Sequence, residues 1–180
     1  GGEPFAAMGA ATPEEAGMQV VDGLRRIDSV SGQEQLAGVL PLGERRVLSV
    51  FRDLISDANL SVSSTTVSGG FTSSEADGVT IIRPDKLPLE YEGESIELDG
   101  TCATQTRQGY RTSTPRSETY CINDVPQLET LGLGEVGIVT IKEDGKWYVS
   151  VLATAAHIMQ TALDNYVTLR DQGRLSELQG

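Results

Sequence analysis

The sequence is short of basic residues, cysteine, histidine and long apolar runs. Its 180 residues hold 14 lysines and arginines against 26 acidic residues, for a net charge of −12. This charge repels nucleic-acid phosphates and anionic lipid headgroups, so we expect no nucleic-acid partner and no peripheral membrane binding. No run approaches the roughly 18 to 20 apolar residues of a membrane span. We therefore expect any membrane tether to lie in a segment absent from this chain.

The shortage of cysteine and histidine restricts the chemistry that the chain can carry. Two thiols and one imidazole cannot complete a tetrahedral zinc site, and the chain has no C-x-x-C motif. Any catalytic scheme with a histidine has to use His157. At 100° per residue, His157 points away from the apolar stripe of its predicted helix, so we expect it to face solvent or a partner. The sequence predicts no catalytic residue, no metal site and no cofactor.

Three helical patterns occupy the first third of the chain. Thr12 and Glu15 have the spacing of a capping box at the start of the first. Ser31 and Glu34 repeat that spacing before a second, short helix that ends at Pro41. Each pattern has one apolar stripe at helical spacing. The stripes are Ala16, Val20, Val21, Leu24 and Ile27, then Leu36, Val39 and Leu40, then Val47, Leu48, Phe51, Leu54 and Ile55.

The middle of the chain has the Ser-, Thr-, Val- and Gly-rich composition of strands, with Gly69-Gly70 among the dipeptides that predict turns. Asp144-Gly145 between two β-rich runs is a strong hairpin signal. We expect Trp147 and Tyr148 to be the core and rim of this hairpin, with ligand stacking as the alternative. The predicted strands are Leu60–Ser68, Val79–Arg83, Leu87–Tyr91, Ser95–Leu98, Cys102–Gln108, Val136–Lys142 and Lys146–Leu152.

A final amphipathic helix follows the last strand, on which Trp147, Val149 and Val151 are expected to share one face. Helices segregated from an antiparallel sheet make an α+β fold. We predict N-terminal helices packed on a curved antiparallel sheet, with an additional C-terminal helix. Residues 12–166 would form one domain, 1–11 a linker and 167–180 a helix end or polar tail. The stripe of the final helix is Ala155, Ile158, Met159, Ala162, Leu163 and Tyr166.

Several short motifs are shared with one known family. They are TPEEAGMQVVDGLRR, the turn in LPLGERRVLSVFRDL, LDGTC with YCIND, and GKWYVSVLATAAHIM. Over roughly residues 12 to 160, the chain resembles the NTF2-like domains found outside the membrane in actinobacteria. The resemblance implies a cone-shaped sheet in a non-catalytic domain behind a transmembrane or lipid anchor. Many such folds end on a strand, so the C-terminal helix of this chain would fill or cap the cone.

The stretch TCATQTRQGYRTSTPRSETYC, residues 101–121, holds both cysteines. Cys102 begins a predicted strand, and we take Cys121 to lie at the end of a strand beside it, so we expect a disulfide, with free buried thiols or a redox role as alternatives. A disulfide implies an oxidising, extracytoplasmic compartment. The basic residues of this stretch would contact an anionic ligand or partner, or else balance the acidic segment Asp85–Asp99. With the hairpin aromatics, the candidate contact residues are Arg107, Tyr110, Arg111, Arg116, Trp147 and Tyr148.

Three classes of function remain open on the sequence. The first is a non-catalytic extracytoplasmic module of a membrane-tethered envelope protein that binds a protein partner or an envelope component, or acts as a sensor. The second is a carrier of a lipid or small apolar molecule, which needs a cavity of several hundred cubic ångströms. An NTF2-like enzyme ranks last. The sequence leaves the oligomeric state open.

Overall fold

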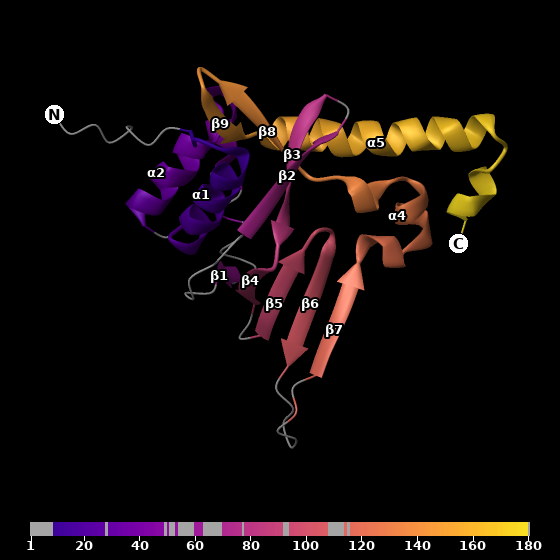
Figure 1. Ribbon diagram of the computed structural model, residues 1–180, viewed down its shortest axis with the longest axis horizontal. Helices are drawn as coiled ribbons and strands as arrows, with labels where there is room; N and C mark the ends of the chain where they lie inside the picture. Colours follow the sequence, from indigo (N-terminus) through magenta and orange to yellow (C-terminus); the bar gives the residue numbers. More distant parts are fainter. Residues whose placement is uncertain are drawn as a thin grey trace.

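The chain combines helices with two antiparallel sheets, which confirms the predicted α+β class. The structure is a computed structural model (Figure 1). The residues that it describes are 9–27, 29–48, 50, 53, 60–62, 70–76, 78–91, 94–107, 114 and 116–179.

Helices α1 (Pro13–Arg25) and α2 (Val30–Val39) pack against each other at one end of the molecule (Figure 1). The Thr12 hydroxyl accepts a hydrogen bond from the Glu15 backbone N–H at 3.1 Å, so Thr12 is the N-cap as predicted. The predicted stripes of both helices are largely buried. Gly9 and Ala10, within the segment expected as a linker, belong to the fold. Ala10 is buried and pairs with β9 through two backbone hydrogen bonds of 2.8 Å.

The second helix begins earlier than predicted. Its N-cap is Ser29, whose hydroxyl accepts a hydrogen bond from the Gly32 backbone N–H at 3.0 Å. The predicted N-cap, Ser31, was wrong because its hydroxyl accepts from the Arg26 guanidinium instead, at 2.8 Å. The turn between the helices is tight, and a Cβ at Gly32 would lie 1.9 Å from the Arg26 carbonyl oxygen. Contacts between the two helices therefore make Ser29, and not Ser31, the N-cap.

The first sheet lies under α1 and has the strand order β2-β3-β8-β9. A Cβ at Gly17 of α1 would lie 2.7 Å from the side chains of Phe71 and Ile82, so helix and sheet approach closely there. Phe71, Ile82, Val21 and Val149 belong to the main core cluster between these two layers. The strands are β2 (Gly70–Ala76), β3 (Val79–Asp85), β8 (Ile138–Glu143) and β9 (Lys146–Val149).

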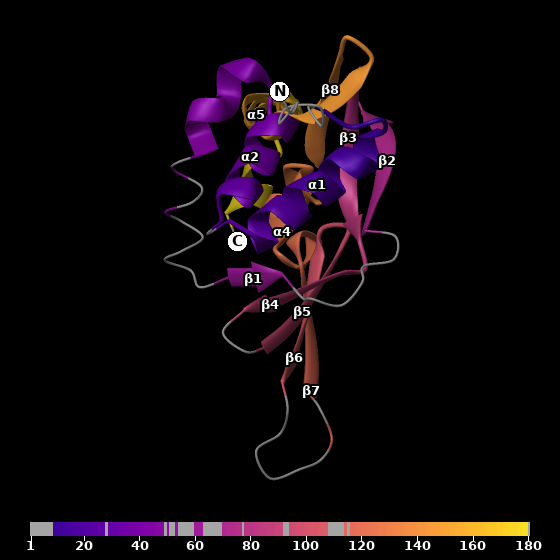
Figure 2. The same ribbon diagram turned by 90° about the vertical axis from the view of Figure 1, so that its left-hand side faces the viewer.

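The second sheet has the order β1-β4-β5-β6-β7, and its strands β5, β6 and β7 extend away from the helices (Figures 1 and 2). The chain passes from β3 of the first sheet to β4 of the second through Lys86, which has a φ of 52°. The strands are β1 (Leu60–Val62), β4 (Leu87–Tyr91), β5 (Glu94–Asp99), β6 (Cys102–Arg107) and β7 (Arg116–Cys121).

Two strand predictions were wrong. No strand was predicted after the turn at Gly69-Gly70, yet β2 begins at Gly70, where φ is 91°. Polar residues fill most of β2 because it is an edge strand with an exposed face. The last strand ends at Val149, so Val151 lies in a helix and does not share a strand face with Trp147.

The long helix α5 (Val151–Asp171) follows β9, with Ser150 as its N-cap (Figure 1). The Ser150 hydroxyl accepts a hydrogen bond from the Ala153 backbone N–H at 3.0 Å.

Between β7 and β8 lies the short helix α4 (Pro126–Thr130), which the sequence did not predict. Of the third predicted stripe, Phe51, Leu54 and Ile55 lie outside the described residues. The 3-10 helices are η1 (Leu42–Val47), η2 (Ile122–Asp124), η3 (Leu133–Glu135) and η4 (Leu175–Leu178).

Candidate functional site

The side of α5 that packs against the domain makes polar contacts along its length and also buries Leu169, which is 4% exposed. The Thr154 hydroxyl accepts a hydrogen bond from the Val139 backbone N–H of β8 at 2.8 Å. Farther along α5, the Asn165 side-chain amide donates to the carbonyl of Leu131, the C-cap of α4, at 3.1 Å. A Cβ at Gly132 would lie 2.6 Å from that amide, so the helix is held close to this loop. These polar groups satisfy backbone groups that packing would otherwise leave without partners.

The apolar side of α5 is turned away from the domain. Leu152 is 62% exposed, Met159 63% and Leu163 57%. Among the described residues, eleven large hydrophobic side chains are exposed, and six of these lie on this one helix. Apolar exposure concentrated on one element is characteristic of an interaction surface rather than of ordinary scattered surface residues. We call these six residues the outer face of α5: Leu152, Ile158, Met159, Leu163, Tyr166 and Val167.

The expected orientation of His157 was wrong. The helical spacing correctly placed His157 opposite the apolar stripe, but that opposite side is the one against the domain. The side chain is half-buried, and its Nε2 atom is buried without a hydrogen-bond partner among the described residues. Periodicity therefore separated the two sides of the helix correctly, but gave no information on which side the domain would cover.

An apolar cavity of about 390 Å³ lies at the base of α5. Its walls come from α1, α2, β8, β9 and the first two turns of α5, and Thr154 is the only polar residue among the described residues that line it. Ala155 and Ile158 line the cavity and are also exposed on α5. The cavity and the outer face of α5 are therefore continuous. The described lining offers no titratable group that could act as an acid, a base or a nucleophile there.

A buried carboxylate fixes the base of α5. Glu44 is 6% exposed and accepts hydrogen bonds from the Val151 and Leu152 backbone N–H groups at 2.5 and 3.0 Å. The Ser150 hydroxyl donates to the same carboxylate at 2.7 Å. A negative group at a helix N-terminus satisfies unpaired N–H groups and interacts favourably with the helix dipole. Glu44 thereby holds the first turn of α5 beside the cavity.

Sequence reasoning missed this role of Glu44. The residue appeared only inside the Pro-x-Gly-Glu turn of the family resemblance. Its hydrogen-bond partners lie more than 100 positions away in the chain, so no local pattern connects them. Neither helix propensity nor spacing contains a signal of this kind.

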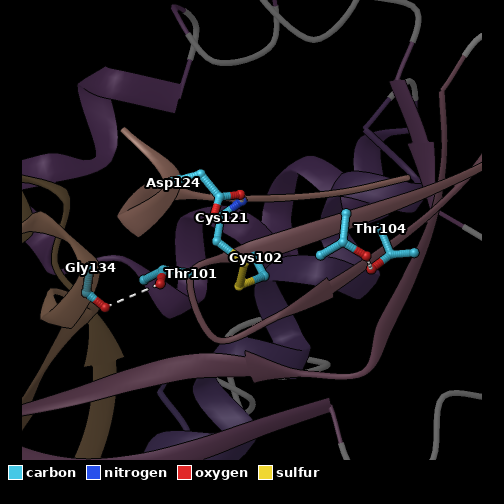
Figure 3. Close-up of a disulfide and its surroundings, with 7 residues drawn as sticks. Thr101, Cys102, Thr104, Cys121, Asp124 and Gly134 are labelled. Carbon is cyan, nitrogen blue, oxygen red and sulfur yellow. Dashed lines mark hydrogen bonds between the residues drawn. A yellow bond between two sulfur atoms is a disulfide. The ribbon is translucent and has the colours of Figure 1, made fainter. Parts of the chain in front are cut away.

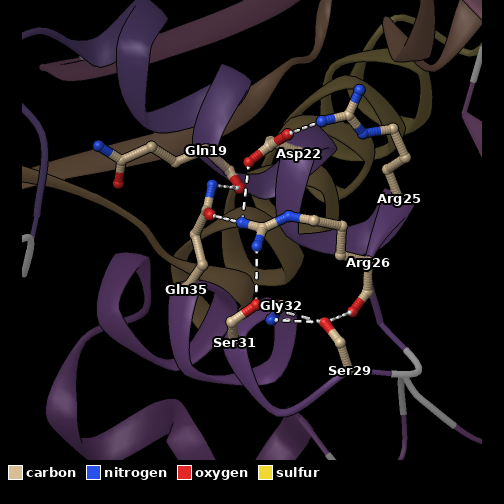
Figure 4. A network of polar contacts seen from close by, with 8 residues as sticks. All are labelled: Gln19, Asp22, Arg25, Arg26, Ser29, Ser31, Gly32 and Gln35. Carbon is tan, nitrogen blue, oxygen red and sulfur yellow. Dashed lines mark hydrogen bonds and ion pairs between the residues drawn. The ribbon is translucent and has the colours of Figure 1, made fainter. Parts of the chain in front are cut away.

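A polar network ties together the two helices that form one wall of the cavity (Figure 4). The guanidinium of Arg26 donates to Asp22 at 3.0 Å and to Gln35 of α2, and the Gln35 amide donates to the Gln19 carbonyl at 3.1 Å. Partial burial raises the pKa of Asp22. Hydrogen bonding with Gln35 and Arg26 and the charges of Arg26 and Arg25 outweigh this, so its pKa lies below the ordinary value.

The disulfide between Cys102 and Cys121 is present, as predicted (Figure 3). The two residues are direct register partners in β6 and β7, so the bond closes the end of this hairpin nearest the domain. Around it, the Cys121 backbone N–H donates to Asp124 at 2.8 Å, and the Thr101 hydroxyl donates to the Gly134 carbonyl at 3.1 Å. These contacts connect the disulfide to the segment that leads to α5.

The two described arginines of the β6–β7 hairpin, Arg107 and Arg116, do not form one site with Trp147 and Tyr148 of the β8–β9 hairpin. Arg107 pairs with Glu94 at 2.9 Å, which matches the alternative that arginines here balance the acidic segment. Arg116 is exposed and lies opposite Arg107 in register. Tyr110 and Arg111 lie outside the described residues. Arg107 and Arg116 end strands of the second sheet, far from β9 of the first (Figure 1).

Trp147 and Tyr148 have structural positions in the first sheet. Trp147 packs against the core cluster, and its backbone pairs with Ala10. The Lys142 ammonium lies 5.8 Å from the centroid of its ring, a cation–π distance. Tyr148 lies against Gly9, where a Cβ would come within 2.9 Å of its ring. Neither aromatic residue is among the described residues that line the cavity.

Comparisons of the chain with protein-family models, with curated proteins and with solved structures found no match. The likeness to NTF2-like domains therefore rests on the short motifs alone.

In the described part of the chain, no three His, Cys, Asp or Glu side chains are grouped so that they could hold a metal ion. No helix among the described residues has the length and apolar character needed to cross a bilayer.

Proposed function

We propose that this chain is a non-catalytic protein-interaction module, and that the outer face of α5 is its docking surface. The observation that supports the proposal is the orientation of α5, whose polar side meets the domain while six large apolar side chains face outward. Burying a fully exposed leucine or methionine side chain gains about 1.5–3 kcal/mol, and the leucines and the methionine of the outer face, which are 57–63% exposed, retain roughly half of this gain. A partner that covers the outer face would gain this energy at several positions.

A protein partner fits this face better than a lipid surface does. Interfacial membrane helices have lysine and arginine on their polar side, which attract anionic headgroups. The polar side of α5 instead packs against the domain, and the chain carries a net charge of −12. A membrane would therefore be repelled by the protein that presents the helix.

The proposal places the module in an oxidising, extracytoplasmic compartment. The Cys102–Cys121 disulfide supports this location, because such bonds are rare where glutathione and thioredoxin keep thiols reduced. The resemblance to anchored NTF2-like domains extends the proposal to an envelope protein whose membrane tether lies in another segment.

The cavity supports a second candidate, a binding site for a small apolar molecule. Its volume of about 390 Å³ lies within the range of roughly 300–1,000 Å³ for ligand sites. A carrier of this kind would bind a fatty-acyl probe in the cavity even when residues of the outer face are substituted. Substitution of Met159, which is on the outer face but not among the cavity residues, therefore separates the two candidates.

Site-specific photocrosslinking in the cells that make the protein tests the docking surface. A photoreactive residue at position 159 should give one discrete protein adduct, which the added substitution Leu163→Glu removes. The control position is Arg174, which is exposed and polar and lies beyond α5. Equal labelling from positions 159 and 174, or no protein adduct from 159, would overturn the proposal. If dodecanoate binds saturably and the Met159→Glu variant binds it equally well, the carrier function is supported.

A further inference from the structure

We propose that the occupant of the outer face is α5 of a second copy of this chain, which runs antiparallel to the first and is centred on Met159. This rests on the proposed function, that the outer face is a docking surface. The proposal assigns a register as well as a partner, because seven apolar positions of α5 are arranged symmetrically about Met159.

The symmetry can be read from seven positions on the exposed side of α5. A two-fold axis at Met159 brings Leu152 opposite Tyr166, and it brings Met159 opposite itself. Alanines lie opposite leucines or other alanines in the remaining pairs. No charged residue is among the seven, and each of the seven meets another member of the set. Ile158 of the outer face lies outside this set, because the axis places it opposite Gln160. We call these positions the seam: Leu152, Ala155, Ala156, Met159, Ala162, Leu163 and Tyr166.

The sizes of the paired side chains are also complementary. The axis places Leu163 opposite Ala155 and Ala162 opposite Ala156, so a large side chain meets a small one and two small ones allow close approach. The seam has the alternating three- and four-residue spacing of helices that pack at shallow crossing angles. In a two-fold interface the same patch serves both partners, so it has to be complementary to itself, as this one is.

The same register covers the open cavity. Val167 of the second copy comes level with Val151, and Tyr166 comes level with Leu152, at the first turn of α5. Val151 lines the cavity. The C-terminal half of each helix would thus lie over the cavity of the other copy, and the two ends of the outer face would be buried together.

The available area sets the expected strength. A helix of 21 residues is about 31 Å long and about 10 Å across, so one face offers less than the roughly 800 Å² per partner of a stable interface. Burial at the two cavities adds to this area, but the interface remains smaller than that of a stable complex. We therefore expect a weak, concentration-dependent dimer.

Charge distinguishes a second copy from a basic partner. Two copies each carry a net charge of −12, and this repulsion is screened over about 8–10 Å at physiological ionic strength. The only acidic residues of α5 are Asp164 and Asp171, and neither is in the seam. Raising the salt concentration should therefore strengthen the dimer, whereas it would weaken binding of a basic partner.

Cysteine crosslinking of the full chain tests the register. The native cysteines are both in one disulfide, so an introduced cysteine is the only free thiol. Met159→Cys alone should give a disulfide-linked dimer under mild oxidation. Leu152→Cys alone should not, because its copy is about 21 Å away along the seam, and Tyr166→Cys alone should not for the same reason. A mixture of the last two variants should crosslink. Arg170→Cys, exposed beyond the seam, is the negative control.

Sedimentation equilibrium gives the second readout. The association constant should rise between about 50 mM and about 500 mM salt. Leu163→Glu should lower it about 100-fold or more, since each dimer loses two buried leucines. Crosslinking of every single variant to itself would indicate parallel helices and overturn the proposed register. A monomer at all concentrations, without crosslinks at position 159, would overturn the dimer. A discrete adduct with a different protein in cells would then leave the proposed docking surface intact.

Discussion

The buried carboxylate of Glu44 accepts a hydrogen bond from the backbone N–H of Val151 at 2.5 Å, which joins a turn of the N-terminal third to the first residue of α5. The contact fixes where the helix begins and which way it leaves the last strand. It also places the first turn of α5 beside the apolar cavity. The orientation of the proposed docking surface depends on this side chain together with the Thr154 and Asn165 contacts.

Replacing this carboxylate should destabilise the fold. In Glu44→Gln, the amide cannot reproduce the three accepted hydrogen bonds or the charge at the helix N-terminus, so we expect a loss of about 1–3 kcal/mol. Urea unfolding measures this loss. Glu97→Gln, at an exposed position on β5, is the matched control and should remain within about 0.5 kcal/mol of the parent. An unchanged Glu44→Gln variant would show that α5 does not depend on this cap.

The outer face of α5 should contribute little to the stability of the single chain. We expect Met159→Gln to change the free energy of unfolding by no more than about 0.5 kcal/mol at low protein concentration. Leu36→Ala is the contrast, because Leu36 is 4% exposed and its truncation should cost about 2–5 kcal/mol. Urea unfolding of both variants is the measurement. A large loss in Met159→Gln would mean that the helix packs with its apolar side inward.

The disulfide should stabilise the chain and leave no reactive thiol. Closing a loop of this length constrains the unfolded chain by about 3 kcal/mol, so the double variant Cys102→Ser with Cys121→Ser should lose a comparable amount. Thiol titration of the denatured, unreduced protein should find no thiol, and titration after reduction should find two. Two thiols before reduction would contradict the disulfide and remove the main support for an extracytoplasmic location.

Acid should weaken the α1–α2 network. The folded-state pKa of Asp22 lies below its ordinary value of about 3.9. The contribution of Asp22 to folding stability is therefore complete above the ordinary pKa, and it is lost as the pH falls through the folded-state pKa. The side chain is partly exposed, so the contribution should be below about 1 kcal/mol. The stability of Asp22→Asn should depend less steeply on pH below pH 4. An identical slope in both proteins would exclude a folded-state role for this carboxylate.

Some elements were predictable because their determinants lie within a few residues. The strand Leu87–Tyr91 was predicted with its exact bounds, and the turn at Asp144-Gly145 joins β8 to β9 with positive φ at both positions. Thr12 caps α1 as its spacing predicted. The Cys102–Cys121 bond joins residues 19 positions apart, and it was predictable because the chain holds only two cysteines and they were expected at the ends of neighbouring strands, which pair in the structure.

The errors have a different cause. Ser31 had the better local capping pattern, but the Arg26 guanidinium occupies its hydroxyl, so Ser29 became the cap. The strand β2 lacks the apolar alternation of a strand because it lies at an edge with one face exposed. In both cases the position of the segment in the tertiary structure decided the outcome, and a local pattern does not contain that position.

The sequence by itself determined that α5 is a helix with one apolar and one polar side, because side chains on a helix repeat every 3.6 residues. It placed His157 on the polar side correctly. Only the tertiary structure decided which side faces the domain. The Val139 N–H and the Leu131 carbonyl need hydrogen-bond partners, and Thr154 and Asn165 supply them. The apolar side was left outward because these polar contacts, together with the Glu44 cap, fix the rotation of the helix about its own axis.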